Sequence, residues 1–358
     1  MEQMRKRHTG RHLVVGGLLL ALTAGSAQAG NAALCFRGVN LSGAEYGEAD
    51  GKEGINFTYP SQATVKYFAD KGFDAVRLPF KWERLQRALG APLDPLELER
   101  LKVSVAGLRA KGFTVILDPH NFGYYSGGKI GTAQVPARQF AQFWIRLAAE
   151  FANQDGIVFG LMNEPYDIDP KDWLDAANQA IAGIRAVKAR NLILVPGTYW
   201  SGVSSWETDF GKGANGPVML GVRDPIDNYG FEVHQYMDED LSGTHRACVN
   251  ADIAVNAIAK LSEWLRTHDK RAFLGEFGGS EDPDCLAGLT RMTMQMADDS
   301  DVWLGWTYWA GGDWWPEGEG NNIKPTAKGD RKQLSALVPN LSPSASKPGS
   351  CAIIPPQG

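Results

Sequence analysis

The chain has 358 residues, of which 44% are hydrophobic and 22% charged, and its formal net charge at pH 7 is −5. This length allows one large domain or two smaller ones. The acidic balance argues against nucleic acid or an anionic membrane as a partner.

The first 29 residues have the features of a secretory signal. Basic residues at positions 5, 6, 7 and 11 precede an apolar run over 13–22, and Ala27-Gln28-Ala29 suits cleavage. Ten apolar residues are too few to span a bilayer. We expect residues 1–29 to be removed and the protein to be secreted, into the periplasm or outside the cell. The remaining chain has a net charge of −8.

The exported part contains four cysteines, which lack the close spacing of metal ligands. In an oxidising compartment they predict two disulfide bonds, for which three connectivities exist. Residues 341–358 are rich in Ser and Pro, and most of this segment is expected to form an extended or loose surface tail. The folded domain is then 30–340. The four cysteines are Cys35, Cys248, Cys285 and Cys351.

A repeat in the chain predicts alternating helices and strands. Residues 71–79 and 111–119 lie forty positions apart, and both read Lys-Gly-Phe, then an apolar run, then proline. Glycine ends a helix readily, and the apolar run predicts a buried strand. Eight such strands start 30 to 43 residues apart, at 36–41, 75–80, 114–119, 157–162, 192–196, 229–234, 272–276 and 302–308.

Helical patterns fill the intervals between these strands, most clearly over 95–111 and 170–189. Eight strand-helix units in one domain favour an α/β fold, a single closed (β/α)8 barrel of the TIM type. The first strand is not followed by a glycine-rich phosphate fingerprint, so we expect no nucleotide cofactor. The histidines and carboxylates lack a convincing ligand set, so we expect no metal.

Polar side chains gather where the predicted strands end. In such barrels the carboxyl ends of the strands meet at one mouth, where active sites are built. Several buried charges converging there are hard to explain by packing alone. The residues at the predicted strand ends are Asn40, Arg77, His120 with Asn121, Asn163 with Glu164, Trp200, His234 with Tyr236, Glu276, and Trp309.

Two glutamates stand out among these residues. Glu164 follows the fourth apolar run and precedes a proline, and Glu276 ends the seventh run between glycines. Paired carboxylates without a cofactor suit glycoside hydrolysis, in which one donates a proton and the other attacks or activates water. Tryptophans near the strand ends offer flat faces for sugar rings, and we expect this of Trp200, Trp206, Trp309, Trp314 and Trp315.

Six segments resemble the glycoside hydrolase family 5 cellulases, and in particular the secreted endo-β-1,4-glucanases. They cover nearly the whole exported chain in order. The segments are Arg77-Leu78-Pro79, Leu117-Asp118-Pro119-His120-Asn121, Met162-Asn163-Glu164-Pro165, Glu232-Val233-His234-Gln235-Tyr236, Leu274-Gly275-Glu276-Phe277-Gly278-Gly279 and Gly305-Trp306-Thr307-Tyr308-Trp309.

The resemblance implies a retaining mechanism with Glu164 as acid/base and Glu276 as nucleophile, and a substrate that is a β-glucan polysaccharide or oligosaccharide. Asn163 matches the residue that holds the sugar 2-hydroxyl. Arg77 and Tyr236 match residues that lower the pKa of the nucleophile and orient it. His120, His234 and Trp309 match substrate-binding positions, and we add Trp200 to them.

Other activities remain open at this point. The same barrel could act as a β-mannanase, a xyloglucanase or a mixed-linkage glucanase, because loop geometry decides which hydroxyl is accepted. A non-catalytic carbohydrate-binding barrel would normally have lost one of the two carboxylates. A surface adhesin is favoured only by the tail. We expect a monomeric enzyme.

The predicted barrel also suggests how the cysteines pair. Cys248 and Cys285 follow the sixth and seventh strands, so neighbouring loops at one mouth can bring them within bridging distance. By elimination, Cys35 then pairs with Cys351 and ties the tail to the first strand.

Overall fold

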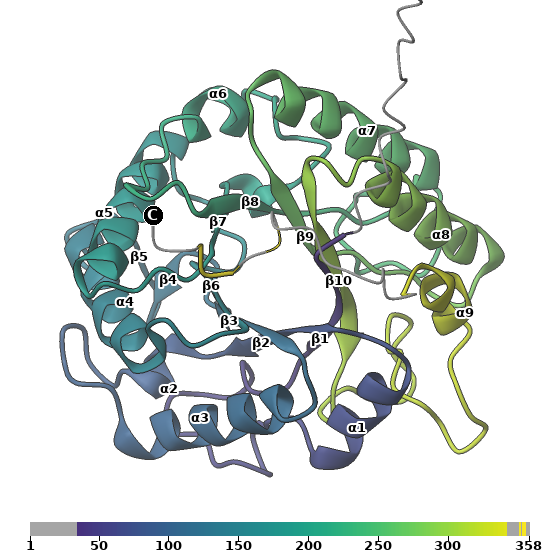
Figure 1. The fold of residues 1–358 in the computed structure, drawn as a ribbon, viewed down its shortest axis with the longest axis horizontal. Helices are drawn as coiled ribbons and strands as arrows, with labels where there is room; N and C mark the ends of the chain where they lie inside the picture. The colour runs from purple at the N-terminus through teal and green to yellow at the C-terminus, as the bar shows by residue number, and fades with distance from the viewer. Residues whose placement is uncertain (1–33, 342–350, 352, 356–358) are drawn as a thin grey trace, which may run out of the picture. The chain divides into compact units, whose positions relative to one another are not determined.

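A computed structural model describes residues 34–341, 351 and 353–355, so the predicted signal at 1–29 lies outside the described residues. Eight parallel strands close into a barrel, which confirms the predicted fold class. Figure 1 looks along this barrel and shows the helices as a ring around the strands. The barrel strands are β1 (Phe36–Leu41), β2 (Ala75–Phe80), β3 (Thr114–Pro119), β6 (Ile157–Gly160), β7 (Ile193–Pro196), β8 (Tyr229–His234), β9 (Ala272–Glu276) and β10 (Trp303–Gly311).

Each strand pairs with the next one in the barrel, and β10 closes the ring by pairing with β1 through Phe36 and Gly305. All eight strands lie at the predicted places, with small differences at their ends. The fourth is shorter than the predicted 157–162, the fifth starts one residue later, and the last runs on to Gly311. A small antiparallel pair, β4 (Tyr124–Tyr125) with β5 (Gly128–Lys129), follows β3.

The helices begin and end where the sequence supplies caps. At the start of α3, the Asp94 carboxylate accepts hydrogen bonds from the backbone N–H groups of Leu96 and Glu97, and Pro95 occupies the first turn. The two glycines of the repeat, Gly72 and Gly112, follow their helices with positive φ angles of 90° and 85°. The helices are α1 (Gln62–Asp70), α2 (Trp82–Leu85), α3 (Pro95–Arg109), α4 (Ala137–Phe151), α5 (Pro170–Ala186), α6 (Asn215–Met219), α7 (Ala251–Thr267), α8 (Pro283–Asp298) and α9 (Gln333–Leu337), with 3-10 turns η1 (Tyr199–Ser201) and η2 (Val338–Asn340).

Two disulfide bonds are present, and they join the pairs expected from the sequence. Cys248 bonds to Cys285 with their Cα atoms 5.0 Å apart, and Cys35 bonds to Cys351 with Cα atoms 5.1 Å apart. The second bond closes a separation of 316 residues. It therefore anchors the end of the chain beside the first barrel strand.

The segment around Ile353 packs against the amino-terminal end of the barrel, so this part of the tail is an exception to the extended or loose segment expected for most of residues 341–358. Ile353 is 8% exposed and belongs to an apolar cluster formed by the first residues of the strands, including Phe36, Phe273 and Leu304. Its carbonyl accepts hydrogen bonds from Leu192 N and from the Asn228 side chain. In Figure 1 this yellow segment lies across the ring of strands.

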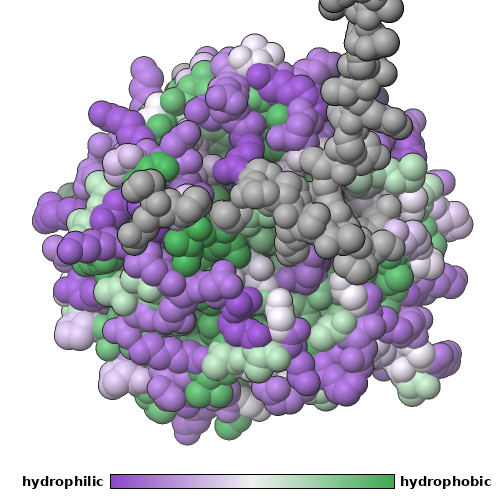
Figure 2. All heavy atoms as spheres, in the orientation of Figure 1, coloured by the Kyte–Doolittle hydropathy of each residue, from purple (hydrophilic) through white to green (hydrophobic). Residues whose placement is uncertain are grey.

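Hydrophilic side chains cover much of the face seen in Figure 2, with smaller apolar groups between them. None of the helices described by the structure is long and apolar enough to cross a membrane. Many large apolar side chains are buried between the barrel and its helices, among them Trp82, Trp144 and Trp173, each fully inaccessible to solvent.

We predict that Ile353→Ala lowers thermal stability because it leaves a void at the amino-terminal end of the barrel. A loss of about 2 kcal/mol is typical of such a truncation, and it would lower Tm by about 4 °C in a domain of this size. Calorimetry of the two single variants checks this. Ile354→Ala is the matched control, because Ile354 is only partly buried against the same cluster. Equal Tm losses in both variants would contradict the assignment.

Candidate active site

The carboxyl ends of the strands surround a cavity of about 600 Å³. It brings together six of the residues predicted from the sequence: His120, Glu164, Tyr236, Glu276, Trp309 and Trp315. Arg77, Asn163 and His234 are buried and make contact with one another or with these residues, whereas Trp200 does not line this cavity. The remaining lining residues are Phe122, Ser242, Gly243, Thr244, His245, Arg246, Gly318, Glu319, Gly320 and Asn321.

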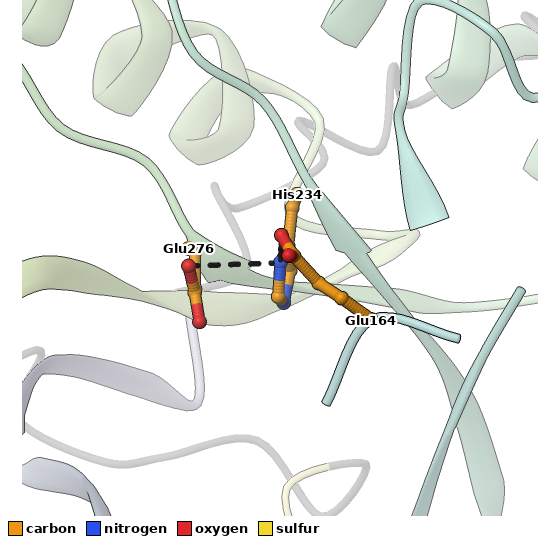
Figure 3. Close-up of side chains that lie close together, drawn as sticks. All are labelled: Glu164, His234 and Glu276. Atoms are coloured by element: carbon orange, nitrogen blue, oxygen red, sulfur yellow. Dashed lines mark hydrogen bonds and ion pairs between the residues drawn. The ribbon is translucent and has the colours of Figure 1, made fainter. Parts of the chain in front are cut away.

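The two glutamates both lie beside His234, as Figure 3 shows, and the nearest ring nitrogen of each is Nδ1. One carboxylate oxygen of Glu164 and one of Glu276 lie within 4.8 Å of each other. Glu276 is the last residue of β9, and Glu164 comes four residues after β6 ends. Glu164 has a φ of 38°, a left-handed backbone conformation that is costly for a residue other than glycine. Such strain at a concave polar site is typical of functional residues.

Arg77 connects the strands beneath the mouth. Its guanidinium is fully buried and lies 2.9 Å from a Glu276 oxygen and 3.0 Å from an Asp118 oxygen. It also donates to the side-chain oxygens of Asn40 and Asn163, at 3.0 and 2.9 Å. Burial opposes its charge, but the carboxylates around it raise the pKa of Arg77, so it stays cationic. It therefore holds Glu276 from below.

Tyr236 holds the other oxygen of Glu276, because its hydroxyl donates a 2.8 Å hydrogen bond to Oε2. Burial and the neighbouring Glu276 charge raise the pKa of Tyr236, so it remains a donor. For Glu276 itself, burial raises the pKa, although His234 and Arg77 act in the opposite direction. The lowered pKa expected from the sequence was wrong, because desolvation at the barrel mouth outweighs the cations.

His234 bridges the two glutamates. Its Nδ1 lies 2.7 Å from Glu164 Oε1 and 3.8 Å from Glu276 Oε2. Burial lowers the pKa of His234, but the surrounding carboxylates, led by Glu276, raise it to about 10. The imidazole is therefore a cation between two carboxylates at neutral pH, with a proton on Nδ1 that it donates to Glu164.

Two groups among the described residues have donors spaced closely enough for a cation. The first is the cluster of Glu164, His234 and Glu276, and the second is Asp238 with Asp240 and His245. In the first group the side chains already form hydrogen bonds with one another, with Arg77 and with Tyr236. We therefore assign no metal ion to this group. The second group lies in the loop after β8.

The rings of His120, Trp309 and Trp315 form one side of the cavity beside the glutamates. Asp118 accepts a 2.8 Å hydrogen bond from His120 Nδ1, and the His120 ring stacks on Trp309 at 5.2 Å with 16° between the planes. Burial opposes the charge of His120, but Asp118 raises its pKa. Trp315 packs edge-on against Trp309 and also lines the cavity. Trp309 is thus held in place by two ring contacts where it lines the cavity.

The other predicted tryptophans are divided by their burial. Trp200 is 53% exposed and stacks on Tyr166 at 5.2 Å, which forms a second flat platform outside the cavity. Trp206 is only 2% exposed and packs against Phe231 and Trp264. The expectation that Trp206 stacks on sugars was therefore wrong, because the loop after β7 folds its ring into the core. Trp314 stacks on Tyr46 and is not among the residues that line the cavity.

Some residues that build the site received no role from the sequence. Asp118 orients both Arg77 and His120, and Asn40 donates to Gly275 O at 2.9 Å while it receives Arg77. Asp118 and His120 are two positions apart, so they share one side of a strand, which could have signalled their pairing. The contact of Asn40 with β9 joins residues 235 positions apart, for which the sequence carries no local signal.

A closed parallel barrel with two close carboxylates and exposed aromatic rings at its mouth defines a class of protein, the barrel glycoside hydrolases. The comparison with known families agrees with this class and narrows it. The family described as Cellulase (glycosyl hydrolase family 5) matches residues 31–312. The chain belongs to this family.

Similar proteins are found in fungi and in bacteria. Endo-beta-1,4-glucanase B of Emericella nidulans is 34% identical over 311 residues, which are 85% of this chain and 92% of that protein. The crystal structure of an endo-beta-1,4-glucanase from Xanthomonas axonopodis pv. citri is 43% identical and superposes with a TM-score of 0.84 over 86% of this chain and 98% of its own. The structure of XacCel5A in complex with cellopentaose is 41% identical, also with a TM-score of 0.84, over 86% and 99%.

We predict that Trp309→Ala weakens the use of cellopentaose while the fold is kept. Loss of one aromatic face costs about 1.5 to 3 kcal/mol, which corresponds to a fall in kcat/KM of about 10- to 100-fold. Trp206→Ala is the matched control, because it removes the same side chain from the core. It should lower Tm but leave kcat/KM of the folded enzyme within about threefold. An unchanged kcat/KM in Trp309→Ala would remove this ring from the site.

Proposed function

We propose that the chain is an endo-acting β-1,4-glucanase that cleaves cellulose and related β-glucans with retention of anomeric configuration. The observation that carries the proposal is the separation of Glu164 and Glu276, whose nearest ligand oxygens lie within 4.8 Å. Retaining glycosidases place their carboxyl groups about 5 Å apart, whereas inverting enzymes need about 6.5 Å or more to admit a water.

In the first step, Glu276 is the nucleophile and Glu164 the general acid. A Glu276 oxygen bonds to the anomeric carbon as the glycosidic C–O bond breaks, and the Glu164 proton moves to the leaving oxygen. Arg77 and Tyr236 hold Glu276 in place through both of its oxygens. The product of this step is a glycosyl ester on Glu276 and a shortened glucan.

In the second step, Glu164 is the general base. It removes a proton from water, the water oxygen bonds to the anomeric carbon, and the ester bond to Glu276 breaks. Each step inverts the anomeric carbon, so the overall result is retention. His234 Nδ1 donates to Glu164 at 2.7 Å and keeps this carboxylate directed at the mouth.

Substrate binding is assigned to the groups that surround the glutamates. Asn163 Nδ2 is buried and has no hydrogen-bond partner among the described residues, so a sugar 2-hydroxyl is a fitting acceptor. His120 and Trp309 provide the wall on which a glucose ring stacks, and Trp200 offers a further platform. These roles agree with the cellopentaose bound by XacCel5A.

The compartment and the domain limits belong to the same proposal. We assign residues 1–29 to a signal removed on export, 30–340 to the catalytic domain and 341–358 to a tail whose end is anchored at Cys351. The family match that begins at residue 31 supports the first limit, and the two disulfide bonds suit an oxidising compartment. We propose that the active enzyme is a monomer.

A substrate panel tests the proposed specificity. We expect reducing ends to appear fastest from carboxymethyl cellulose, with a rapid loss of viscosity that marks cleavage within the chain. Mannan, xyloglucan and mixed-linkage glucan are the comparison substrates, and faster release from one of them would replace cellulose as the assigned substrate. No release from any of them would point to a non-catalytic carbohydrate-binding barrel.

Anomer analysis tests the mechanism. NMR of a fresh hydrolysate should show the β-anomer first, and the α-anomer only after mutarotation. Release of the α-anomer first would exclude Glu276 as a nucleophile.

Two matched variants assign the glutamates individually. With azide and an aryl β-cellobioside, Glu276→Gly should form the α-glycosyl azide, because azide attacks from the side the nucleophile has left. Glu164→Ala should instead form the β-glycosyl azide from the ester. The reverse pattern would exchange the two roles.

A further inference from the structure

A third glutamate lies beneath the proposed pair and takes no part in the two steps. Glu232 is 1% exposed and precedes His234 by two positions on β8. Residues two apart on a strand share a face, so Glu232 points into the barrel one layer below His234. A buried carboxylate is retained only where its charge is satisfied or used.

The contacts of Glu232 are made by one oxygen. Oε1 lies 2.7 Å from Arg77 Nε and 3.6 Å from His234 Nε2. Oε2 is buried and has no hydrogen-bond partner among the residues described. The Glu232 charge is therefore directed at two cations, the guanidinium and the far side of the imidazole.

The neighbouring strands leave room for this arrangement. A Cβ on Gly275 of β9 would lie 2.5 Å from Glu232 Oε1 and 2.9 Å from His234 Nε2, closer than side-chain atoms approach. A Cβ on Gly160 of β6 would lie 3.2 Å from Oε2. Glycine at both positions allows the carboxylate and the imidazole to sit side by side.

His234 consequently has a carboxylate facing each ring nitrogen. Nδ1 faces Glu164 at 2.7 Å and Glu276 at 3.8 Å, and Nε2 faces Glu232 at 3.6 Å. Asp118 on β3 adds a further negative charge near the ring. Among cations, Arg77 on β2 and His120 after β3 act on the same carboxylates. Only a ring protonated at both nitrogens directs an N–H group at the carboxylates on both of its sides.

We propose that Glu232 is a positioning residue that holds His234 as an imidazolium, so that Nδ1 donates to Glu164 and a positive charge stays beside Glu276 throughout the reaction. This inference deepens the proposed function and rests on it for its kinetic consequence. Its structural consequence, the charge state of His234, can be measured without a substrate.

The direction of the effect follows from the neighbours. The carboxylates raise the pKa of His234 to about 10 against the effect of burial. Without the Glu232 charge, the effect of burial is opposed by fewer negative charges. The pKa of His234 then falls, and the imidazole loses its proton at lower pH. Glu276 then loses its main positive neighbour, so its pKa rises further. The acid limb of the kcat/KM profile should therefore move to higher pH.

Glu232→Gln keeps the shape of the side chain and removes the charge. With ¹⁵N-labelled histidine, NMR of the wild-type chain should show His234 as an imidazolium up to at least pH 9. In Glu232→Gln its titration midpoint should fall by about 2 pH units, the size of effect expected from one buried charge. The acid limb of kcat/KM should move up by about 1 pH unit. An imidazolium that persists to pH 9 in Glu232→Gln would overturn the proposal.

Two further variants separate positioning from structural damage. Glu97→Gln is the matched control, because Glu97 is equally buried at 1% and pairs with the buried Arg84 at 3.1 Å. It should lower Tm without moving the His234 titration or the pH profile. Glu232→Asp keeps the anion and should restore the imidazolium.

If Glu232→Gln does not fold, the titration of His234 in the wild-type chain still tests the proposal. A His234 ring that becomes neutral below pH 8 in the wild-type chain would overturn the proposal. A chain that hydrolyses none of the glucans but shows the expected titrations would count against the proposed function alone.

Discussion

The structure depends on one buried cation, the guanidinium of Arg77. It lies within 3.0 Å of carboxylate oxygens from Asp118 on β3, Glu232 on β8 and Glu276 on β9. A buried charge left without partners costs several kcal/mol, so the ions stabilise the fold only as a complete set. Closure of the barrel and assembly of the site are consequently linked in free energy, because strands distant in sequence supply the partners of the same guanidinium.

The two ends of the barrel divide stability and chemistry between them. The amino-terminal end is apolar and is covered by Ile353, which the bond between Cys35 and Cys351 holds in place. The carboxyl-terminal end holds the charges and the strained backbone of Glu164. This division is typical of such barrels, in which the catalytic face can carry strain because the rest of the barrel is well packed.

Electrostatics at the mouth arise from competition between burial and charge. Burial raises the pKa of Glu276, and His234 and Arg77 oppose this rise. The same burial would neutralise His234, yet the carboxylates raise its pKa to about 10. Each ion is therefore stabilised by its neighbours rather than by water, so the protonation state of the site is a property of the whole cluster.

Much of the fold and part of the site could be read from short segments of sequence. The repeat at 71–79 and 111–119, with its glycine caps, predicted the strand-helix units, and Glu164 and Glu276 were recognisable because each is a charge at the end of an apolar run. Trp206 shows the limit of this reasoning. It stands in a polar loop like Trp200, and only its tertiary contacts with Phe231 on β8 and Trp264 on α7 make it a core residue.

By itself, the sequence determined the eight strands, the face of the barrel that carries the polar residues, and the two glutamates, because period, caps and strand ends are local properties. The tertiary structure alone decided which tryptophans reach the cavity, that the segment at Ile353 closes the far end, and that Glu232 lies against His234. It also decided the direction of the Glu276 pKa. These features depend on distances and on exclusion of water between segments far apart in the chain, which no local pattern encodes.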